Sequence, residues 1–275
     1  MTTSILITGC SSGIGYYCAA ELNKVGYNVI ASCRQQRDVE RLNSQGIPCI
    51  QLDLRCSESI DRGLKQALVL ANGQLDVLFN NAAYGQPGAL EDLSTEALRA
   101  QFETNFFGWH QLTRAVIPLM LQQGHGKIIQ NSSVLGLVAM KYRGAYNASK
   151  FAIEGYTDTL RLELANTPIK IALIEPGPIE SHFRQNAKSQ FEQHIDINHS
   201  RHHDAYQQTL HRLGTTTPNN KFTLSPDAVF KQVLAIINSK RPKARYYVTQ
   251  PTYIFGFLRR ILPTKWLDKL LIKSN

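Results

Sequence analysis

An alternation of short apolar segments with longer helical ones constrains the fold of this 275-residue chain most strongly. The apolar segments are residues 4–8, 28–33, 49–52, 77–80, 127–131, 170–174 and 245–248, and the helical patterns are residues 14–25, 57–71, 95–121, 145–166 and 226–239. Strands without polar alternation are typical of a parallel sheet covered by helices on both faces. We therefore predict one doubly wound α/β domain over residues 1–250, with about seven strands.

The charge balance limits the classes of partner. The formal net charge is +9, which suits nucleic acid, a membrane surface or an anionic small ligand such as a phosphorylated cofactor. The basic residues are scattered and form no stripe interleaved with aromatic residues, so no nucleic-acid partner is expected. No apolar run approaches the length of a spanning helix, and residues 4–8 follow no charged leader. We expect a soluble cytoplasmic protein.

The five cysteines all lie in the first 56 residues: Cys10, Cys18, Cys33, Cys49 and Cys56. Their odd number and the lack of a C-x-x-C pair predict reduced, mostly buried thiols rather than disulfides or a metal site.

A glycine-rich turn joins the first apolar segment to the first helical pattern. Residues 8–15 read TGCSSGIG. In such a turn Gly9 permits the tight bend, Gly13 lets the backbone approach a pyrophosphate, and Gly15 lets helix and strand pack closely. The phosphates would lie at the helix N-terminus, where free N–H groups favour negative charge. This pattern predicts a Rossmann-type cofactor site formed by Gly9, Ser11, Ser12, Gly13, Ile14 and Gly15.

Two other segments end where such a cofactor would lie. The fourth apolar segment is followed by Asn81 and Ala82, and small residues there would let the backbone line the adenosine side. Asp53, followed by Leu54, ends the third segment and could accept a hydrogen bond from an adenine amino group. Taken singly, each is also compatible with an ordinary turn or cap.

Tyr146 and Lys150 form the candidate chemical pair. Residues four apart share one face of a helix, and an ammonium beside a phenol lowers the phenol's pKa from about 10. Tyr146 could then donate a proton to a carbonyl oxygen or accept one from an alcohol. Ser133, thirteen residues before Tyr146, ends the preceding strand and strengthens this interpretation.

These motifs together resemble the short-chain dehydrogenase/reductase family, in its single-domain subdivision. The resemblance extends from about residue 4 to residue 248 and is carried by residues 8–15, 80–85 and 176–179 and by Asn105, Ser133, Tyr146 and Lys150. The nearest branch is that of retinol and hydroxysteroid dehydrogenases and bacterial NADP-dependent aldehyde reductases. The chain has Ala83 where the family often has glycine, and Ser181 where it often has threonine.

The resemblance implies a role for each matched residue. Ser133 would hydrogen-bond the substrate carbonyl, Tyr146 would transfer the proton, and Lys150 would hold the nicotinamide ribose and lower the Tyr146 pKa. Asn105 would anchor a water in the proton relay, and Ile179 would meet the nicotinamide carboxamide through its backbone. The further cofactor contacts expected are Arg34, Asp53, Leu54, Asn81, Ala82, Tyr146, Lys150, Pro176, Gly177 and Ser181, with no metal.

The end of the second apolar segment bears on cofactor choice. NAD-specific enzymes usually place an acidic side chain there, but this chain has Cys33, then Arg34, and no carboxylate before Asp38. Arg34 could stack on adenine and donate to a 2′-phosphate, with Arg37 as a second donor; otherwise both are solvated residues that open the next helix.

The sequence thus predicts NADP(H) as cofactor and the reduction of an aldehyde or ketone substrate. The alternatives are NAD-dependent oxidation of a lipophilic alcohol, retinoid- or steroid-like, and a non-catalytic dinucleotide-binding redox sensor.

Three further segments suggest what covers the substrate and which partners the chain binds. The polar residues 182–220, with His194, His199, His202 and His203, are expected to form a helical excursion over the substrate, with a metal cluster as the alternative. Residues 95–121 and 145–166 are apolar on more than one side, and related enzymes pair through such helices, so we expect a homodimer or homotetramer. Residues 251–275 repeat apolar residues at helical spacing among basic ones; they would pack on protein or contact the inner membrane face through 252–275.

Overall fold

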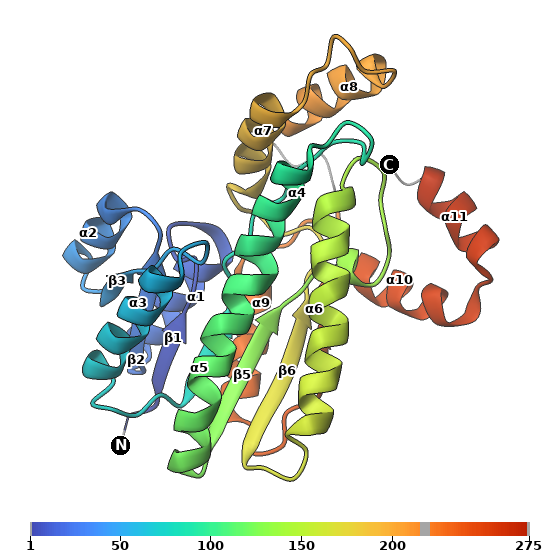
Figure 1. Cartoon of the computed structure of the whole chain (residues 1–275). Coiled ribbons are helices and arrows are strands. Elements are labelled where there is room, and N and C mark those ends of the chain that lie inside the picture. The colour runs from blue at the N-terminus through green and yellow to red at the C-terminus, as the bar shows by residue number, and fades with distance from the viewer. Residues whose placement is uncertain (1, 215–220, 274–275) are drawn as a thin grey trace.

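The computed structural model describes residues 2–214 and 221–273, and its centre is a parallel sheet with strand order β3-β2-β1-β4-β5-β6-β7 (Figure 1). The strands are β1 (Ser4–Ile7), β2 (Asn28–Cys33), β3 (Cys49–Gln51), β4 (Val77–Asn80), β5 (Gly126–Asn131), β6 (Ile169–Glu175) and β7 (Arg245–Tyr247). The seven predicted strands and the doubly wound, Rossmann-type sheet are confirmed. The strand order reverses between β1 and β4, and ligands of such sheets bind at the carboxyl edge beside this point.

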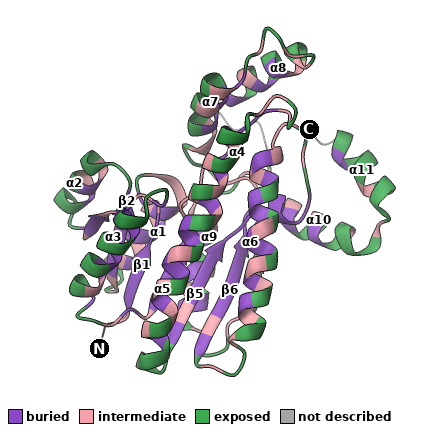
Figure 2. Ribbon diagram, in the orientation of Figure 1, coloured by how far each residue is buried: buried purple, intermediate pink, exposed green. Residues whose placement is uncertain are grey.

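Helices cover both faces of the sheet. The helices are α1 (Gly13–Lys24), α2 (Gln36–Ser44), α3 (Ser57–Leu70), α4 (Thr95–Phe102), α5 (Gly108–Gln123), α6 (Gly144–Glu163), α7 (Phe183–His194), α8 (His203–Gly214), α9 (Asp227–Asn238), α10 (Gln250–Ile261) and α11 (Thr264–Lys273). Alternate residues of one strand supply the two cores: Ile5 and Ile7 pack in the core with α1 and α9, and Leu6 packs in the core with α3 and α5. Figure 2 shows the buried strands between these layers.

Two helical segments differ from the prediction. Helix α2 was not predicted, because only Val39 and Leu42 of its nine residues are buried and their spacing is short. The pattern over residues 95–121 is helical as predicted, but a π-helical turn, Glu103–Phe107, separates α4 from α5. Single π-turns of this kind are frequent at functional sites.

The cysteines agree with the expectation. All five are free thiols; Cys10, Cys18, Cys33 and Cys49 are buried, and Cys56 is exposed.

The predicted excursion after β6 consists of α7 and α8, which stand beyond the carboxyl edge of the sheet (Figure 1). They pack on each other and on residues 89–93 around buried Phe191, Ile195 and Tyr206. Part of the predicted excursion, residues 215–220, lies outside the described residues. Among the helices that the structure describes, none is both long and apolar enough to span a bilayer.

Candidate active site

The glycine-rich turn between β1 and α1 is shaped by close backbone approach. Gly9 has φ +73°, and a Cβ atom there would lie 2.6 Å from the Cα of Ala82. A Cβ on Gly15 would lie 2.3 Å from the carbonyl oxygen of Gly9. Ser12 precedes α1 in an extended conformation and gives it no side-chain cap, so the first N–H groups of the helix stay available. This uncapped helix start behind a glycine cradle fits a dinucleotide pyrophosphate.

A chain of hydrogen bonds links this turn to Lys150. Thr8 Oγ1 accepts from the backbone N–H groups of Asn81 and Ala82, at 2.9 and 3.0 Å. The Asn81 amide oxygen accepts from Asn131 Nδ2 at 2.8 Å, and the Asn131 carbonyl oxygen accepts from Lys150 Nζ at 2.7 Å. Asn81 and Ala82 therefore hold the cofactor turn in place. Thr8 and Asn131, which were not predicted as site residues, are part of the same chain.

Lys150 lies at the bottom of the site and is 1% exposed. Its Nζ lies 4.7 Å from the ring centroid of Trp109 and 5.6 Å from that of Tyr146. Burial lowers the pKa of Lys150 to about 7, and the Glu154 carboxylate opposes this effect. The ammonium is thus held beside the phenol ring, as the helical spacing predicted.

The pKa of Tyr146 differs from the expectation. Burial raises it to about 12, while the Ser133 hydroxyl and the Arg143 guanidinium act to lower it. The predicted lowering by Lys150 does not dominate, because Lys150 is itself desolvated and donates to Asn131. Ser133 Oγ faces the phenol and accepts from the backbone N–H of Leu135 at 3.1 Å.

Asn105 lies in the π-helical turn and connects two walls of the site. Its Oδ1 accepts from Tyr84 N–H at 3.2 Å, and its Nδ2 donates to the Tyr84 carbonyl at 3.0 Å and to Ser149 Oγ at 3.2 Å. These contacts fix the loop after β4 to α6. The water-anchoring role expected for Asn105 stays a prediction.

Phe183, at the start of α7, covers the Tyr146 ring. Its ring meets the Tyr146 ring edge-on, with centroids 5.3 Å apart. A Cβ on Gly85 would lie 2.8 Å from the Phe183 ring, so the loop after β4 also packs against it. The first turn of the excursion therefore closes over the site, and no motif in the sequence indicated this residue.

The loop after β6 forms the remaining side. The Pro176 carbonyl accepts from Val134 N–H at 2.8 Å, and a Cβ on Gly177 would lie 2.1 Å from Thr249 Oγ1. Ser181 lies against the glycine-rich turn, since a Cβ on Gly13 would be 2.9 Å from Ser181 Cβ. The Ile179 carbonyl accepts from Ser181 Oγ at 3.4 Å, which shapes the loop.

The segment after β2, where the adenosine end of the cofactor is expected, contains a guanidinium that was not predicted and that pairs with Asp38. Cys33 is buried, whereas Arg34 is exposed beside it. Arg41, which was not predicted, donates from Nη2 to the Ser11 carbonyl at 2.7 Å and to Asp38 at 3.2 Å. The guanidinium of this α2 residue is thus fixed against the glycine-rich turn.

The segment after β3 is ordered by its own contacts. The Asp53 carboxylate accepts from Arg55 N–H at 3.0 Å. Leu54 is buried, and its carbonyl would lie 2.2 Å from a Cβ on Gly108. Both residues lie at the carboxyl edge of the sheet, as predicted, and their contacts to adenine stay a prediction.

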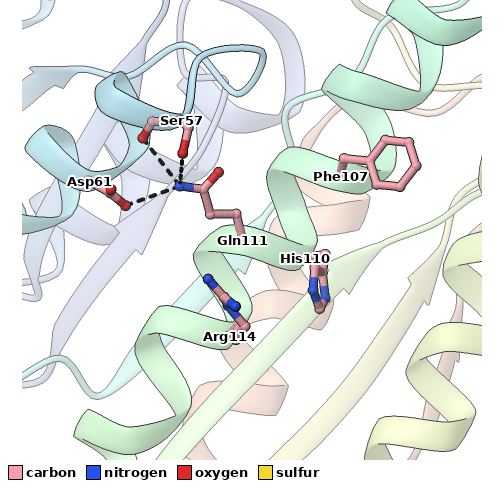
Figure 3. Close-up of a pocket in the computed structure, with 6 residues that line it drawn as sticks. All are labelled: Ser57, Asp61, Phe107, His110, Gln111 and Arg114. Carbon is pink, nitrogen blue, oxygen red and sulfur yellow. Dashed lines mark hydrogen bonds between the residues drawn. The ribbon is translucent and has the colours of Figure 1, made fainter.

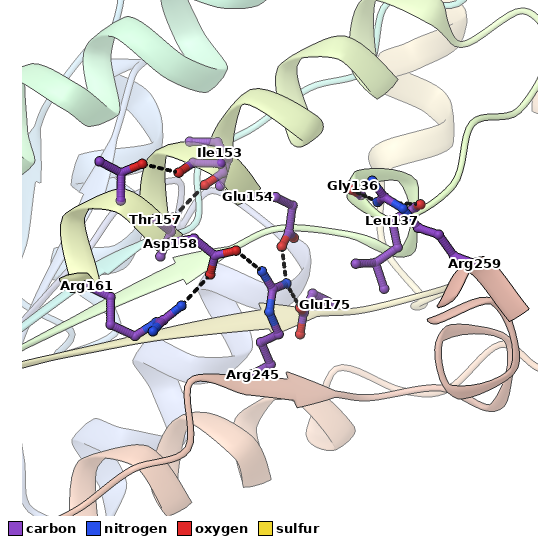
Figure 4. A network of polar contacts seen from close by, with 12 residues as sticks. Gly136, Leu137, Ile153, Glu154, Thr157, Asp158, Arg161, Glu175, Arg245 and Arg259 are labelled. Carbon is purple, nitrogen blue, oxygen red and sulfur yellow. Dashed lines mark hydrogen bonds and ion pairs between the residues drawn. The ribbon is translucent and has the colours of Figure 1, made fainter. Parts of the chain in front are cut away.

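An ionic cluster surrounds Arg245 (Figure 4), and it includes Glu154, which lies one helical turn after Lys150 on α6. Arg245 of β7 pairs with Glu154, with Glu175 at 2.7 Å and with Asp158 at 2.6 Å. Glu175 is fully buried, and burial raises its pKa to about 8. One guanidinium therefore contacts three acidic side chains on α6 and β6, and Asp158 also pairs with Arg161 at 2.7 Å.

Two hollows lie outside the Tyr146–Lys150 pair. A groove of about 620 Å³ is lined by residues 88–91 and 139–142, by Gly144 and Asn147 of α6, and by Asp268, Leu271 and Ile272 of α11. Another lies on the outer face of α5, where Gln111 donates to Ser57 and Asp61 (Figure 3). The histidines of the excursion pair separately, His199 with Asp196 and His202 with Glu91. Among the described residues no metal-binding group of three side chains occurs.

The arrangement can hold a dinucleotide along the carboxyl edge and present a phenol and a hydroxyl to one substrate oxygen. These are the features of a dinucleotide-dependent oxidoreductase. A bound nicotinamide cofactor would supply the hydride, and the protein supplies orientation and the proton.

Comparison with known proteins agrees with this class. The family model described as short chain dehydrogenase matches residues 3–192. The chain is 42% identical over 273 residues to the uncharacterized oxidoreductase YbbO of Escherichia coli K12, covering 98% of this chain and 94% of that protein. It is 35% identical over 257 residues to human retinol dehydrogenase 8, covering 88% and 80%. A solved structure of an actinorhodin polyketide ketoreductase variant with NADPH superposes with TM-score 0.72 at 28% identity, covering 90% and 95%. The chain belongs to the short-chain dehydrogenase family.

Proposed function

We propose that this oxidoreductase reduces a lipophilic aldehyde or ketone with NADPH. The observation that carries this proposal is the position of the buried Tyr146 phenol against the Ser133 hydroxyl, with Lys150 Nζ 5.6 Å from the centroid of the phenol ring. The pKa of this phenol is about 12, so it keeps its proton at neutral pH. A protonated phenol is suited to act as the general acid that a carbonyl reduction requires.

The neighbouring groups support this role. The Ser133 and Tyr146 hydroxyls can donate to one substrate oxygen and stabilise the negative charge that develops on it. When Tyr146 gives up its proton, the Lys150 ammonium, 5.6 Å from the ring, stabilises the phenolate.

Two arginine side chains support NADPH, rather than NADH, as the cofactor. The position of the usual acidic residue is occupied by buried Cys33. Arg34 follows it, and Arg41 is fixed to the carbonyl of Ser11. A 2′-phosphate would gain charge-assisted hydrogen bonds from such groups.

The apolar surroundings support a lipophilic substrate. Val134, Leu135 and Val138 form one apolar cluster with Tyr146 and Met140. The relative named retinol dehydrogenase 8 carries a lipophilic alcohol in its name.

The test follows nicotinamide absorbance with NADPH or NADH and a panel of aldehydes, ketones, steroids and retinoids. We expect NADPH-dependent turnover of long-chain or cyclic apolar carbonyls, and none with Tyr146→Phe. Faster oxidation of retinoid or steroid alcohols with NAD would contradict the proposal. Cofactor binding without turnover of any substrate would favour a redox sensor.

A further inference from the structure

The two C-terminal helices expose an apolar surface outside the catalytic site. Seven of the sixteen large hydrophobic side chains that are exposed in the described part of the chain lie on α10 and α11. On α10 they are Tyr253, Ile254, Phe257 and Ile261, which are 51–62% exposed. Their spacing places them on one face of the helix.

The opposite face of α10 is fixed to the domain. Thr252 and Gly256 are buried, and a Cβ on Gly256 would lie 2.7 Å from the Tyr247 ring. Arg259 donates to the carbonyl oxygens of Leu137 and Gly136, at 2.7 and 3.3 Å. The helix is therefore held on one side, and its apolar face is turned away from the domain. Figure 2 shows α11 largely exposed at the edge of the molecule.

Basic residues accompany this face. Arg260, Lys265, Lys269 and Lys273 are exposed, and Asp268 is the one acidic residue within 250–273. Lysine is depleted in the cores of protein interfaces, whereas apolar faces bordered by Lys and Arg are typical of helices that lie in anionic bilayer surfaces. The charge pattern thus favours lipid over a second protein.

Helix α11 borders the groove of about 620 Å³, and its Leu271 belongs to the apolar cluster on which Tyr146 packs. Asp268, Leu271 and Ile272 form part of the groove wall, and Leu271 packs in one cluster with Leu135 and Val138. A surface that binds α11 would therefore lie next to the groove.

We propose that α10 and α11 dock this enzyme on an anionic phospholipid bilayer, with the apolar face in the acyl boundary and the basic residues at the phosphates. Docking in this way places the groove at the membrane, where a lipophilic substrate is concentrated. This second step rests on the proposed function, whereas the docking itself does not.

Vesicle flotation tests the docking. The full chain should float with phosphatidylcholine vesicles that contain phosphatidylglycerol, and not with pure phosphatidylcholine. Phe257→Glu/Trp266→Glu removes two exposed apolar side chains and adds repelling charge, so vesicle affinity should fall at least about tenfold. Val69→Glu/Leu70→Glu, on exposed positions of α3, is the matched control and should float like the wild type.

A second pair of variants tests the charges. Arg260→Gln/Lys265→Gln/Lys269→Gln should weaken flotation, while Lys240→Gln/Arg241→Gln/Lys243→Gln removes as much charge outside the helices and should not. No flotation of the wild type, or equal loss in both triple variants, would overturn the proposal. So would a Phe257→Glu/Trp266→Glu protein that floats normally but has a smaller mass by light scattering, because the face would then bind a second copy.

Activity separates the two steps. Turnover of an aldehyde dissolved in vesicles should fall in Phe257→Glu/Trp266→Glu, while turnover of a water-soluble aldehyde should not. Flotation without turnover of either aldehyde would leave docking supported and contradict the proposed function.

Discussion

Glu154 lies one helical turn beyond Lys150 on α6, and its carboxylate raises the pKa of the Lys150 ammonium against the larger lowering effect of burial. The resulting pKa is about 7. Lys150 therefore carries its charge below this pH and loses it above. Since the charge stabilises the phenolate left after proton transfer, kcat/KM for carbonyl reduction should fall as the pH rises through about 7.

Glu154→Gln tests this relationship, because it removes the carboxylate charge and keeps a hydrogen-bond acceptor for Arg245. The fall in the pH–rate profile should move to lower pH. Glu163→Gln, on an exposed residue at the end of the same helix, should leave the profile unchanged. An unchanged profile in Glu154→Gln would show that Lys150 is not the group that titrates.

Tyr146→Phe removes the proton donor but keeps the ring that packs on Phe183. We expect kcat to fall about 10²–10⁴-fold with NADPH affinity nearly unchanged. Lys150→Ala should damage both, since it also breaks the hydrogen bond to Asn131. Steady-state kinetics and cofactor titration measure the two effects. A Phe variant with substantial residual kcat would contradict the proton-transfer role.

The ionic cluster around Arg245 should contribute to stability. Arg245→Met leaves the buried Glu154 carboxylate without its cation and removes a hydrogen-bond donor from Glu175, and such a loss costs about 3 kcal/mol of unfolding free energy. Urea unfolding measures it. Adding Glu154→Gln and Glu175→Gln to Arg245→Met should recover most of the loss, because the cost comes from uncompensated charge. If the triple variant is no more stable, packing rather than charge is the cause.

The parts of the site that could be predicted are those whose residues are close in sequence. The glycine turn and the Tyr146–Lys150 pair have fixed local spacing, so a single helix or turn defines them. Asn131, Arg41 and Phe183 reach the site only through the packing of β5, α2 and α7 around it, and no local pattern records that packing. The prediction that the Tyr146 pKa is lowered was wrong for the same reason. Sequence spacing shows that Lys150 is a neighbour of Tyr146, but it does not show how deeply the phenol is buried.

Self-association should use the outer faces of α5 and α6. Phe107, the last residue of the π-helical turn before α5, is 49% exposed, and Phe151 and Leu162 of α6 are 36% and 70% exposed. We expect a homodimer or homotetramer at micromolar concentration by light scattering. Leu162→Glu should reduce the mass, whereas Val69→Glu on α3 should not. A monomeric wild type would contradict this prediction.

Cofactor preference should depend on Arg34 and Arg41. Charge-assisted hydrogen bonds contribute about 1.5–3 kcal/mol, so each guanidinium that contacts a 2′-phosphate should favour NADPH about tenfold to a hundredfold. Arg34→Ala and Arg41→Ala should each reduce kcat/KM for NADPH more than for NADH. Arg62→Ala, which changes an exposed arginine of α3, serves as the matched control.

The double variant Cys33→Asp/Arg34→Ala should change cofactor preference more strongly than either arginine variant. It introduces an acceptor for the ribose hydroxyls and removes a donor to the 2′-phosphate. The ratio of kcat/KM for NADPH to that for NADH should shift toward NADH. Arg41→Ala carries an additional consequence, since Arg41 also holds the Ser11 carbonyl at 2.7 Å. Its loss should loosen the glycine-rich turn and weaken the binding of both cofactors, whereas Arg34→Ala should affect NADPH alone. A wild type that prefers NADH would contradict the assignment of both residues.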